Sequence, residues 1–158
     1  MTRYGMAIDL KRCFGCHACE VACKVANNLP ADLAYNRVMT VGGDSFDTAA
    51  GEFPNCTLSF LPMQCQHCET PACFAVCPTG ATQKDEKTGI VTVDGETCIG
   101  CGSCIQACPY QGVRTLIGDD PDYYLDVVVG EADAPAHKPS TVEKCTFCKN
   151  LVDRGEEP

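Results

Sequence analysis

The chain has 158 residues, a net charge of −9 and fifteen cysteines. The acidic balance argues against nucleic-acid binding, which needs a basic surface, and no apolar run approaches the ~20 residues of a transmembrane helix. A cysteine content this high in a short chain predicts either a disulfide scaffold or a metal protein. The first residues, MTRYGMAIDLKRC, contain neither an apolar signal region nor a twin arginine, so we expect reduced thiols and metal binding.

The first half of the chain predicts short elements around two cysteine groups. Residues 6–12 indicate a strand, and residues 13–26 indicate a loop that becomes a helix. Residues 27–54 are expected to be irregular, because the segment is polar and rich in glycine. Residues 56–65 favour a strand, and residues 70–81 favour a short helix that ends before a proline.

The second half repeats this pattern. Residues 82–98 alternate apolar and polar side chains around a turn, which is typical of a β-hairpin. Residues 102–113 predict a second short helix ended by a proline. Residues 118–140 are acidic, with a strand-like piece at 125–129, and indicate an insertion or linker. Residues 141–148 predict a strand followed by a loop.

Fourteen of the fifteen cysteines lie in four tight groups, which start at Cys13, Cys65, Cys98 and Cys145. Disulfide frameworks spread their cysteines to close long loops, whereas close spacing suits ligands of one metal centre. A hairpin joins the two middle groups, as in a two-cluster ferredoxin. The outer groups have the pattern of a second such unit, split by insertion of the first.

The third group has the spacing C-x2-C-x2-C-x3-C-P of bacterial ferredoxins. Its first three cysteines lie in a loop where Gly100 and Gly102 allow a close backbone approach to a cluster. The fourth cysteine follows on a short helix, is expected to point away, and therefore ligates the other cluster of the pair. The group consists of Cys98, Cys101, Cys104 and Cys108, followed by Pro109.

The second group has the same plan with two extra residues before its third cysteine, and it consists of Cys65, Cys68, Cys73 and Cys77. The crossed pattern assigns one cluster to Cys65, Cys68, Cys73 and Cys108. It assigns the other to Cys98, Cys101, Cys104 and Cys77. Zinc is the weaker alternative, because zinc ribbons use two separated C-x2-C pairs.

The outer groups are incomplete. The first contains Cys13, Cys16, Cys19 and Cys23, and the fourth contains only Cys145 and Cys148. By the same crossed logic, Cys23 belongs with Cys145 and Cys148. The triple Cys13, Cys16 and Cys19 needs a fourth ligand that the groups do not supply.

Four stretches together resemble the four-cluster iron–sulfur subunit of the dimethyl sulfoxide reductase family. They are DLKRCFGCHACEVACK, PMQCQHCETPACFAVCPTGAT, GIVTVDGETCIGCGSCIQACPYQGVRT and VEKCTFC, and the similarity covers nearly the whole chain. In that family two further cysteines follow the fourth group, so the resemblance implies a C-terminal truncation. Some relatives carry tryptophan within the third group and hold a three-iron cluster there. Here Cys101 is cysteine, so [4Fe-4S] clusters are expected throughout.

The resemblance implies an α+β fold of two ferredoxin-like units, one inserted in the other. Residues 1–54 and 141–158 would form the outer unit, residues 55–117 the inner unit, and residues 118–140 the linker. The implied function is electron relay, with no catalysis by the chain itself, between a membrane quinol-linked anchor subunit and a molybdopterin catalytic subunit. The complex would be membrane-associated, with the chain peripheral on the periplasmic or the cytoplasmic side. A free soluble polyferredoxin and a structural zinc module are the alternatives.

Several residues outside the ligand sets allow two interpretations, one functional and one structural. Cys56 is either a spare ligand or, more simply, a small buried strand residue. His67 either tunes a cluster by hydrogen bonding or is a solvated loop residue, and solvation is also the expectation for His17 and His137. Lys24 either raises a cluster potential or is solvated. Tyr110 packs on a cluster or in the core, and residues 119–122 form a solvated loop or a docking site.

Overall fold

The computed structural model describes residues 3–42, 48–132, 134 and 136–158. Within these ranges the chain forms short helices and four antiparallel two-stranded sheets, which confirms an α+β fold. No helix in the described part is long and apolar enough to cross a membrane.

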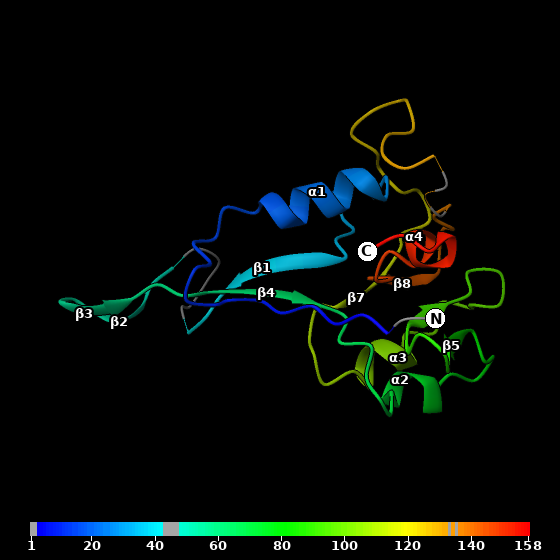
Figure 1. Ribbon diagram of the computed structural model, residues 1–158, viewed down its shortest axis with the longest axis horizontal. Helices are drawn as coiled ribbons and strands as arrows, with labels where there is room; N and C mark the ends of the chain where they lie inside the picture. The colour runs from blue at the N-terminus through cyan, green and yellow to red at the C-terminus, as the bar shows by residue number, and fades with distance from the viewer. Residues whose placement is uncertain (1–2, 43–47, 133, 135) are drawn as a thin grey trace.

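The N-terminal part is a helix laid along a two-stranded ribbon (Figure 1). Helix α1 (Ala18–Ala26) has Glu20 in its first turn and Lys24 in its last, as the helix dipole favours. Strand β1 (Asn36–Thr40) pairs antiparallel with β4 (Phe60–Gln64). The backbone N–H of Val38 donates to the Glu20 carboxylate at 3.2 Å, which fastens the helix to the ribbon.

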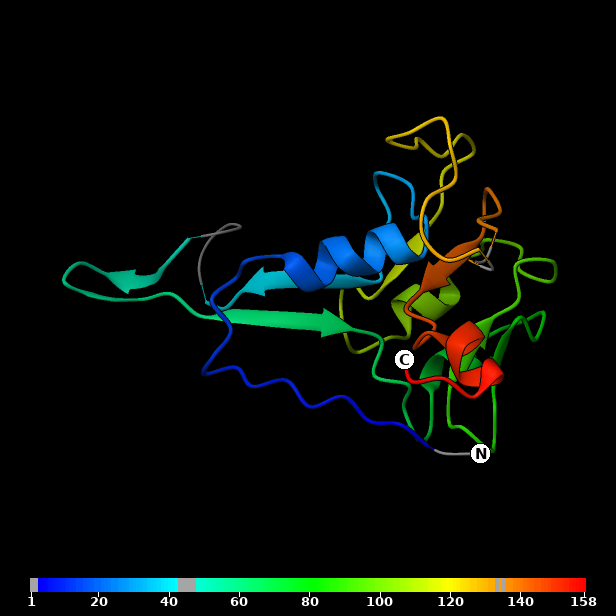
Figure 2. The same ribbon diagram turned by 45° about the horizontal axis from the view of Figure 1, so that its top comes forward.

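A hairpin projects from the end of this ribbon as an arm. It consists of β2 (Ala50–Glu52) and β3 (Asn55–Thr57), and both views place it away from the rest of the chain (Figures 1 and 2). Phe53 at its turn is 92% exposed. The arm and β1 show that the expectation of irregular structure over residues 27–54 was wrong. The strand predicted for residues 56–65 is two strands, because the chain leaves the arm before it enters β4.

The middle of the chain holds two helix-and-loop units around a hairpin. Helices α2 (Ala72–Ala75) and α3 (Ser103–Gln106) are each one turn long and end shortly before a proline, as predicted. Strands β5 (Thr82–Lys84) and β6 (Val91–Val93) form the expected antiparallel hairpin. The Asp85 carboxylate accepts from the Lys87 N–H at 2.8 Å and from the Thr88 hydroxyl at 2.9 Å, which stabilises the turn.

The last sheet joins segments far apart in sequence. Strand β7 (Arg114–Leu116) pairs antiparallel with β8 (Val142–Lys144), and helix α4 (Lys149–Arg154) follows. The described residues between β7 and β8 contain no helix or strand, so the prediction of a strand-like piece at residues 125–129 was wrong. Residues 6–12 also form no strand. They are exposed and run below β4 (Figure 2), and residues 10–12 form a turn in which the Arg12 N–H donates to the Asp9 carbonyl at 3.1 Å.

Many of the buried apolar side chains form two small clusters, and cysteines belong to one and pack against both. Leu29, Leu33, Tyr35 and Ile117 make the first, with Cys23 and Cys145 packed against it. The second contains Cys73, Val91, Cys104 and Val142, with Cys98 and Ile105 against it. The cysteine groups therefore lie where the chain buries its apolar surface.

Candidate iron–sulfur sites

One cavity brings together cysteines from two different groups. Cys98, Cys101 and Cys104 line it from the loop before α3 and from α3 itself, and Cys77 lines it from the end of the α2 segment. Ala81, Val93 and Val142 supply apolar walls. These four cysteines are the set that the crossed pattern assigns to one cluster; Cys104 is buried, Cys77 and Cys98 are half-buried, and Cys101 is exposed.

Hydrogen bonds in this cavity favour thiolates, the form that binds metal. The backbone N–H of Thr82 donates to Cys77 Sγ at 3.4 Å, and that of Val142 donates to Cys98 Sγ at 3.5 Å. Burial raises the pKa of Cys77, but hydrogen bonds from Thr82 and Thr79 outweigh it and bring the pKa to about 7. Hydrogen bonding with Ser103 lowers the pKa of Cys101.

A second convergence joins the first and last groups. Burial, followed by the negative charges of Cys145 and Cys148, raises the pKa of Cys23 to about 12. A cation among these three thiols would favour their ionised form. The Asn27 side chain lies 3.6 Å from Cys23 Sγ, and the Phe147 N–H donates to Cys145 Sγ at 3.3 Å. Such N–H···S bonds are typical of iron–sulfur ligands.

The other two sets are less sharply defined. Cys73 is buried, Cys65 and Cys68 are half-buried, and their grouping with Cys108 stays a prediction. Cys16 and Cys19 are exposed and Cys13 is half-buried in the loop before α1, so the third set also stays a prediction.

Gly100 is a backbone requirement of the third group. Its φ is +65°, and a Cβ there would collide with the carbonyl oxygen of Ser140, whereas a Cβ on Gly102, at φ +72°, would meet nothing within 4 Å. Both positions strain an L-residue by about 1–2 kcal/mol, but only Gly100 adds a backbone clash. We expect Gly100→Ala to lower the thermal midpoint of the iron-loaded protein by several degrees more than Gly102→Ala. Equal midpoints in the two variants would contradict this account.

All three histidines are half-buried and lie within hydrogen-bonding distance of a partner, although solvation was the expectation, and His67 is the first. The Val91 N–H donates to His67 Nδ1 at 2.9 Å, so the ring is neutral with its proton on Nε2. Burial, and then the charges of Lys144 and Arg114, lower the pKa of His67 to about 3. His67 also meets the Phe147 ring edge-on, with centroids 5.5 Å apart. The His67 ring, which belongs to the second cysteine group, therefore packs against Phe147 of the fourth group.

His137 is the second, with a side chain only 1% exposed, and it forms a polar network beside the Cys23 and Cys145 pair. Its Nε2 donates to the Asn27 carbonyl at 2.8 Å, and its Nδ1 lies 2.7 Å from Glu143 Oε2. Burial lowers the pKa of His137, but the hydrogen bond and charge of Glu143 outweigh it and leave the pKa raised. Tyr35 donates to the same carboxylate at 2.5 Å.

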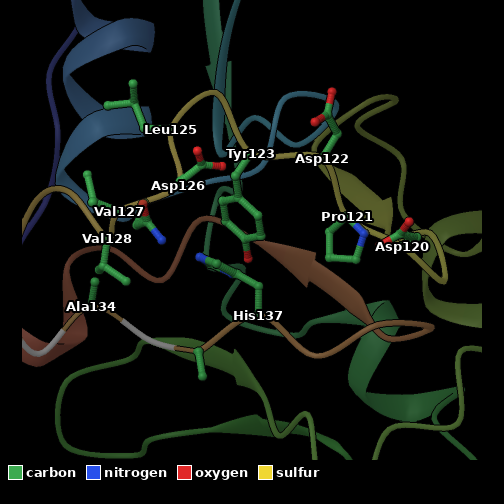
Figure 3. A pocket seen from close by; sticks show the side chains of 12 residues that line it. Asp120, Pro121, Asp122, Tyr123, Leu125, Asp126, Val127, Val128, Ala134 and His137 are labelled. Atoms are coloured by element: carbon green, nitrogen blue, oxygen red, sulfur yellow. The ribbon is translucent and has the colours of Figure 1, made fainter.

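A cavity of about 870 Å³ is lined by His137 and by residues that precede it in the chain, among them Asp120, Tyr123 and Val128. Figure 3 shows the Tyr123 ring above His137, with Asp120, Asp122 and Asp126 spaced around the opening. Within residues 119–122 the three aspartates are exposed and Pro121 is half-buried, in agreement with a solvated acidic loop.

The remaining expectations have mixed outcomes. Cys56 is exposed in the arm, so the buried reading was wrong. Lys24 is engaged rather than solvated. Its Nζ donates to the carbonyls of Ala31 at 2.6 Å and Leu33 at 3.0 Å. Tyr110 is 38% exposed, which does not fit core packing. His17 is half-buried, with Nδ1 at 3.0 Å from the Glu20 carboxylate.

The donor chemistry fits iron–sulfur clusters. Among the described residues, no three His, Cys, Asp or Glu side chains form a group that could hold a single metal ion. Four cysteines instead line one cavity, and backbone N–H groups donate to two of their sulfurs, those of Cys77 and Cys98. Thiolates with N–H···S bonds in an apolar setting define a ferredoxin-type protein.

Comparisons with known proteins agree with this class. Two families described as 4Fe-4S dicluster domains match residues 56–117 and residues 90–153, and a 4Fe-4S binding domain family matches residues 10–26. The protein therefore binds [4Fe-4S] clusters.

Curated relatives specify the family. A protein of Halobacterium salinarum named as an iron–sulfur subunit of dimethyl sulfoxide reductase is 40% identical over 100% of this chain and 61% of its own length. One of the chains of the Escherichia coli anaerobic dimethyl sulfoxide reductase is 43% identical over 99% of this chain and 67% of its own. The thiosulfate reductase electron transfer subunit of Salmonella typhi is 39% identical over 99% and 68%. The chain belongs to the family of iron–sulfur subunits of dimethyl sulfoxide reductase-type enzymes, and it spans about three fifths of the length of the Halobacterium relative.

Proposed function

We propose that the protein is the electron-transfer subunit of a reductase complex and performs no catalysis itself. Its clusters would relay electrons between a quinol-linked membrane anchor subunit and a molybdopterin catalytic subunit. The chain would lie peripherally in that membrane-associated complex. The observation that carries the proposal is the cavity lined by Cys77, Cys98, Cys101 and Cys104, in a chain whose relatives are named as iron–sulfur and electron-transfer subunits.

We further propose the crossed ligand sets of a double ferredoxin-like repeat. The inner unit, residues 55–117, would hold one cluster on Cys65, Cys68, Cys73 and Cys108. It would hold the other on Cys98, Cys101, Cys104 and Cys77. The outer unit, residues 1–54 and 141–158, would contribute Cys23, Cys145 and Cys148 to a third cluster. It would contribute Cys13, Cys16 and Cys19 to a fourth. Each outer set needs one further ligand beyond the cysteines of these groups.

The protein's own residues position and insulate these sites. When bound, each cluster takes up and releases one electron. Thr82, Val142 and Phe147 offer backbone N–H groups to cysteine sulfurs and stabilise their negative charge. Val93 and Val142 give the cavity apolar walls, which lower the local dielectric around a cluster charge.

The test is iron and acid-labile sulfide per chain after anaerobic reconstitution. We expect about eight of each from the two complete inner sets, and a reduced sample with the paramagnetic resonance of [4Fe-4S]⁺. A colourless zinc-loaded protein without sulfide would exclude the proposal. About sixteen irons would show that the outer sets find ligands elsewhere, from Cys56, a second chain or added thiol.

Association separates a dedicated subunit from a free polyferredoxin. A subunit is expected to co-purify with a large catalytic partner at constant stoichiometry. A protein that elutes alone, and reduces or oxidises several unrelated partners at similar rates, would favour the free carrier.

A further inference from the structure

Two buried cations face each other across the last sheet. Arg114 in β7 lies directly opposite Lys144 in β8, and the two residues are 4% and 3% exposed. Like charges at directly opposed positions destabilise a strand pair, and each charge also loses its hydration. A chain that keeps both cations here needs negative charge close by.

Carboxylates do not supply that charge. In the described part of the chain, neither Arg114 nor Lys144 forms an ion pair with an aspartate or glutamate. Lys144 Nζ donates to two backbone carbonyls, those of Val91 and Cys145, the latter at 2.8 Å. Arg114 Nη2 donates to Cys73 Sγ at 2.8 Å, and Arg114 Nη1 is buried with no hydrogen-bond partner. A guanidinium stays charged at any physiological pH. Because no carboxylate pairs with Arg114 in the described part of the chain, its positive charge needs another anion.

The anions that remain are the cysteine ligands. Arg114 bonds Cys73, and Cys73 shares a buried cluster with Cys104. Burial raises the pKa of Cys104, and the charge of Arg114 opposes that effect. In the proposed ligand sets Cys73 and Cys104 belong to different clusters. Arg114 therefore lies beside a cysteine of each proposed inner set, and its Nη1 has no hydrogen-bond partner.

We propose that Arg114, with Lys144 beside it, is the counter-charge of the two inner clusters and raises their reduction potentials. The inference rests on the proposed function and assigns a tuning role within it. Reduction adds one negative charge to a cluster, and a fixed cation in a water-poor site stabilises the reduced form most. The same cation weakens the repulsion between the two anionic clusters.

The test is Arg114→Gln, which removes the charge and keeps a polar side chain. Redox titration with dithionite, followed by paramagnetic resonance, measures the potentials of the clusters in the assembled protein. At a fixed potential we expect the ratio of reduced to oxidised cluster to fall at least tenfold in the variant. A tenfold change corresponds to about 59 mV for a one-electron couple.

Two further variants separate charge from shape and from global effects. Arg114→Lys restores the charge, and its potentials should lie close to those of the unmodified protein. Lys87→Gln removes an exposed cation from the β5–β6 turn and should leave the potentials unchanged. If Arg114→Gln loses its clusters while Arg114→Lys keeps them at normal potential, the charge requirement is supported.

Three results would overturn the inference. The first is unchanged potentials in an iron-loaded Arg114→Gln protein. The second is an equal loss of iron from Arg114→Gln and Arg114→Lys, which would mean that shape rather than charge matters. The third is an equal shift in Lys87→Gln. Iron and sulfide in the unmodified protein are measured first, so absence of clusters there would sink the proposed function rather than this inference.

Discussion

Replacing Cys77 by serine is expected to remove about four irons per chain, and they should be the same four that a Cys98→Ser variant loses. The reason is that Cys77 and Cys98 line one cavity although they come from different cysteine groups. Ligands on one cluster act as a unit, so their losses should not add. Iron and sulfide analysis of the single and double variants checks this.

The double variants discriminate crossed from local ligation. With crossed sets, Cys77→Ser with Cys98→Ser should lose about four irons, and Cys77→Ser with Cys73→Ser about eight. Local sets would reverse the two counts, and that reversal would refute the crossed assignment. Cys56→Ser is the matched control, because Cys56 is exposed in the projecting arm and should lose none.

Iron removal is expected to unfold most of the chain. The accessible surface is 9656 Å², whereas a globular protein of 16.9 kDa exposes about 7,700 Å². The helices, at nine, four, four and six residues, are shorter than the ~12–15 residues that an isolated helix needs. Isolated two-stranded ribbons are also marginal in water. The clusters must therefore supply much of the stabilisation, as structural metal does in other small domains.

Circular dichroism during anaerobic chelation measures this effect. We expect the cooperative urea transition to disappear with the iron and to return when iron and sulfide are restored. The same chelator already saturated with iron is the control and should leave the fold intact. A metal-free chain that keeps a cooperative transition with a similar midpoint would show that the protein core suffices alone.

Some local elements could be predicted because local sequence decides them. The hairpin of β5 and β6 follows from alternating side chains around an Asp-containing turn, and its hydrogen bonds lie within the segment. The ends of helices α2 and α3 follow from the positions of Pro78 and Pro109, since proline cannot continue a helix interior. The ligand spacing likewise reflects a loop that must wrap one cluster face.

Other elements could not be predicted because distant partners decide them. Strand β1 exists because β4 lies beside it, although its own sequence favoured no strand. Residues 6–12 have strand-like alternation but find no pairing partner among the described residues. The prediction that Cys56 is buried was wrong for the same reason, because its exposure depends on where the β2–β3 arm projects.

The cysteine groups, the [4Fe-4S] chemistry and the class of protein could all be inferred from the amino-acid sequence, because ligand type and spacing are local properties of the chain. The buried polar groups around the sites became visible only in the folded chain. His137 reaches Glu143 and Asn27, and Arg114 faces Lys144, only when β8 pairs with β7. No local pattern marks these residues, because their burial and their missing counter-charges arise from contacts between segments far apart in the chain.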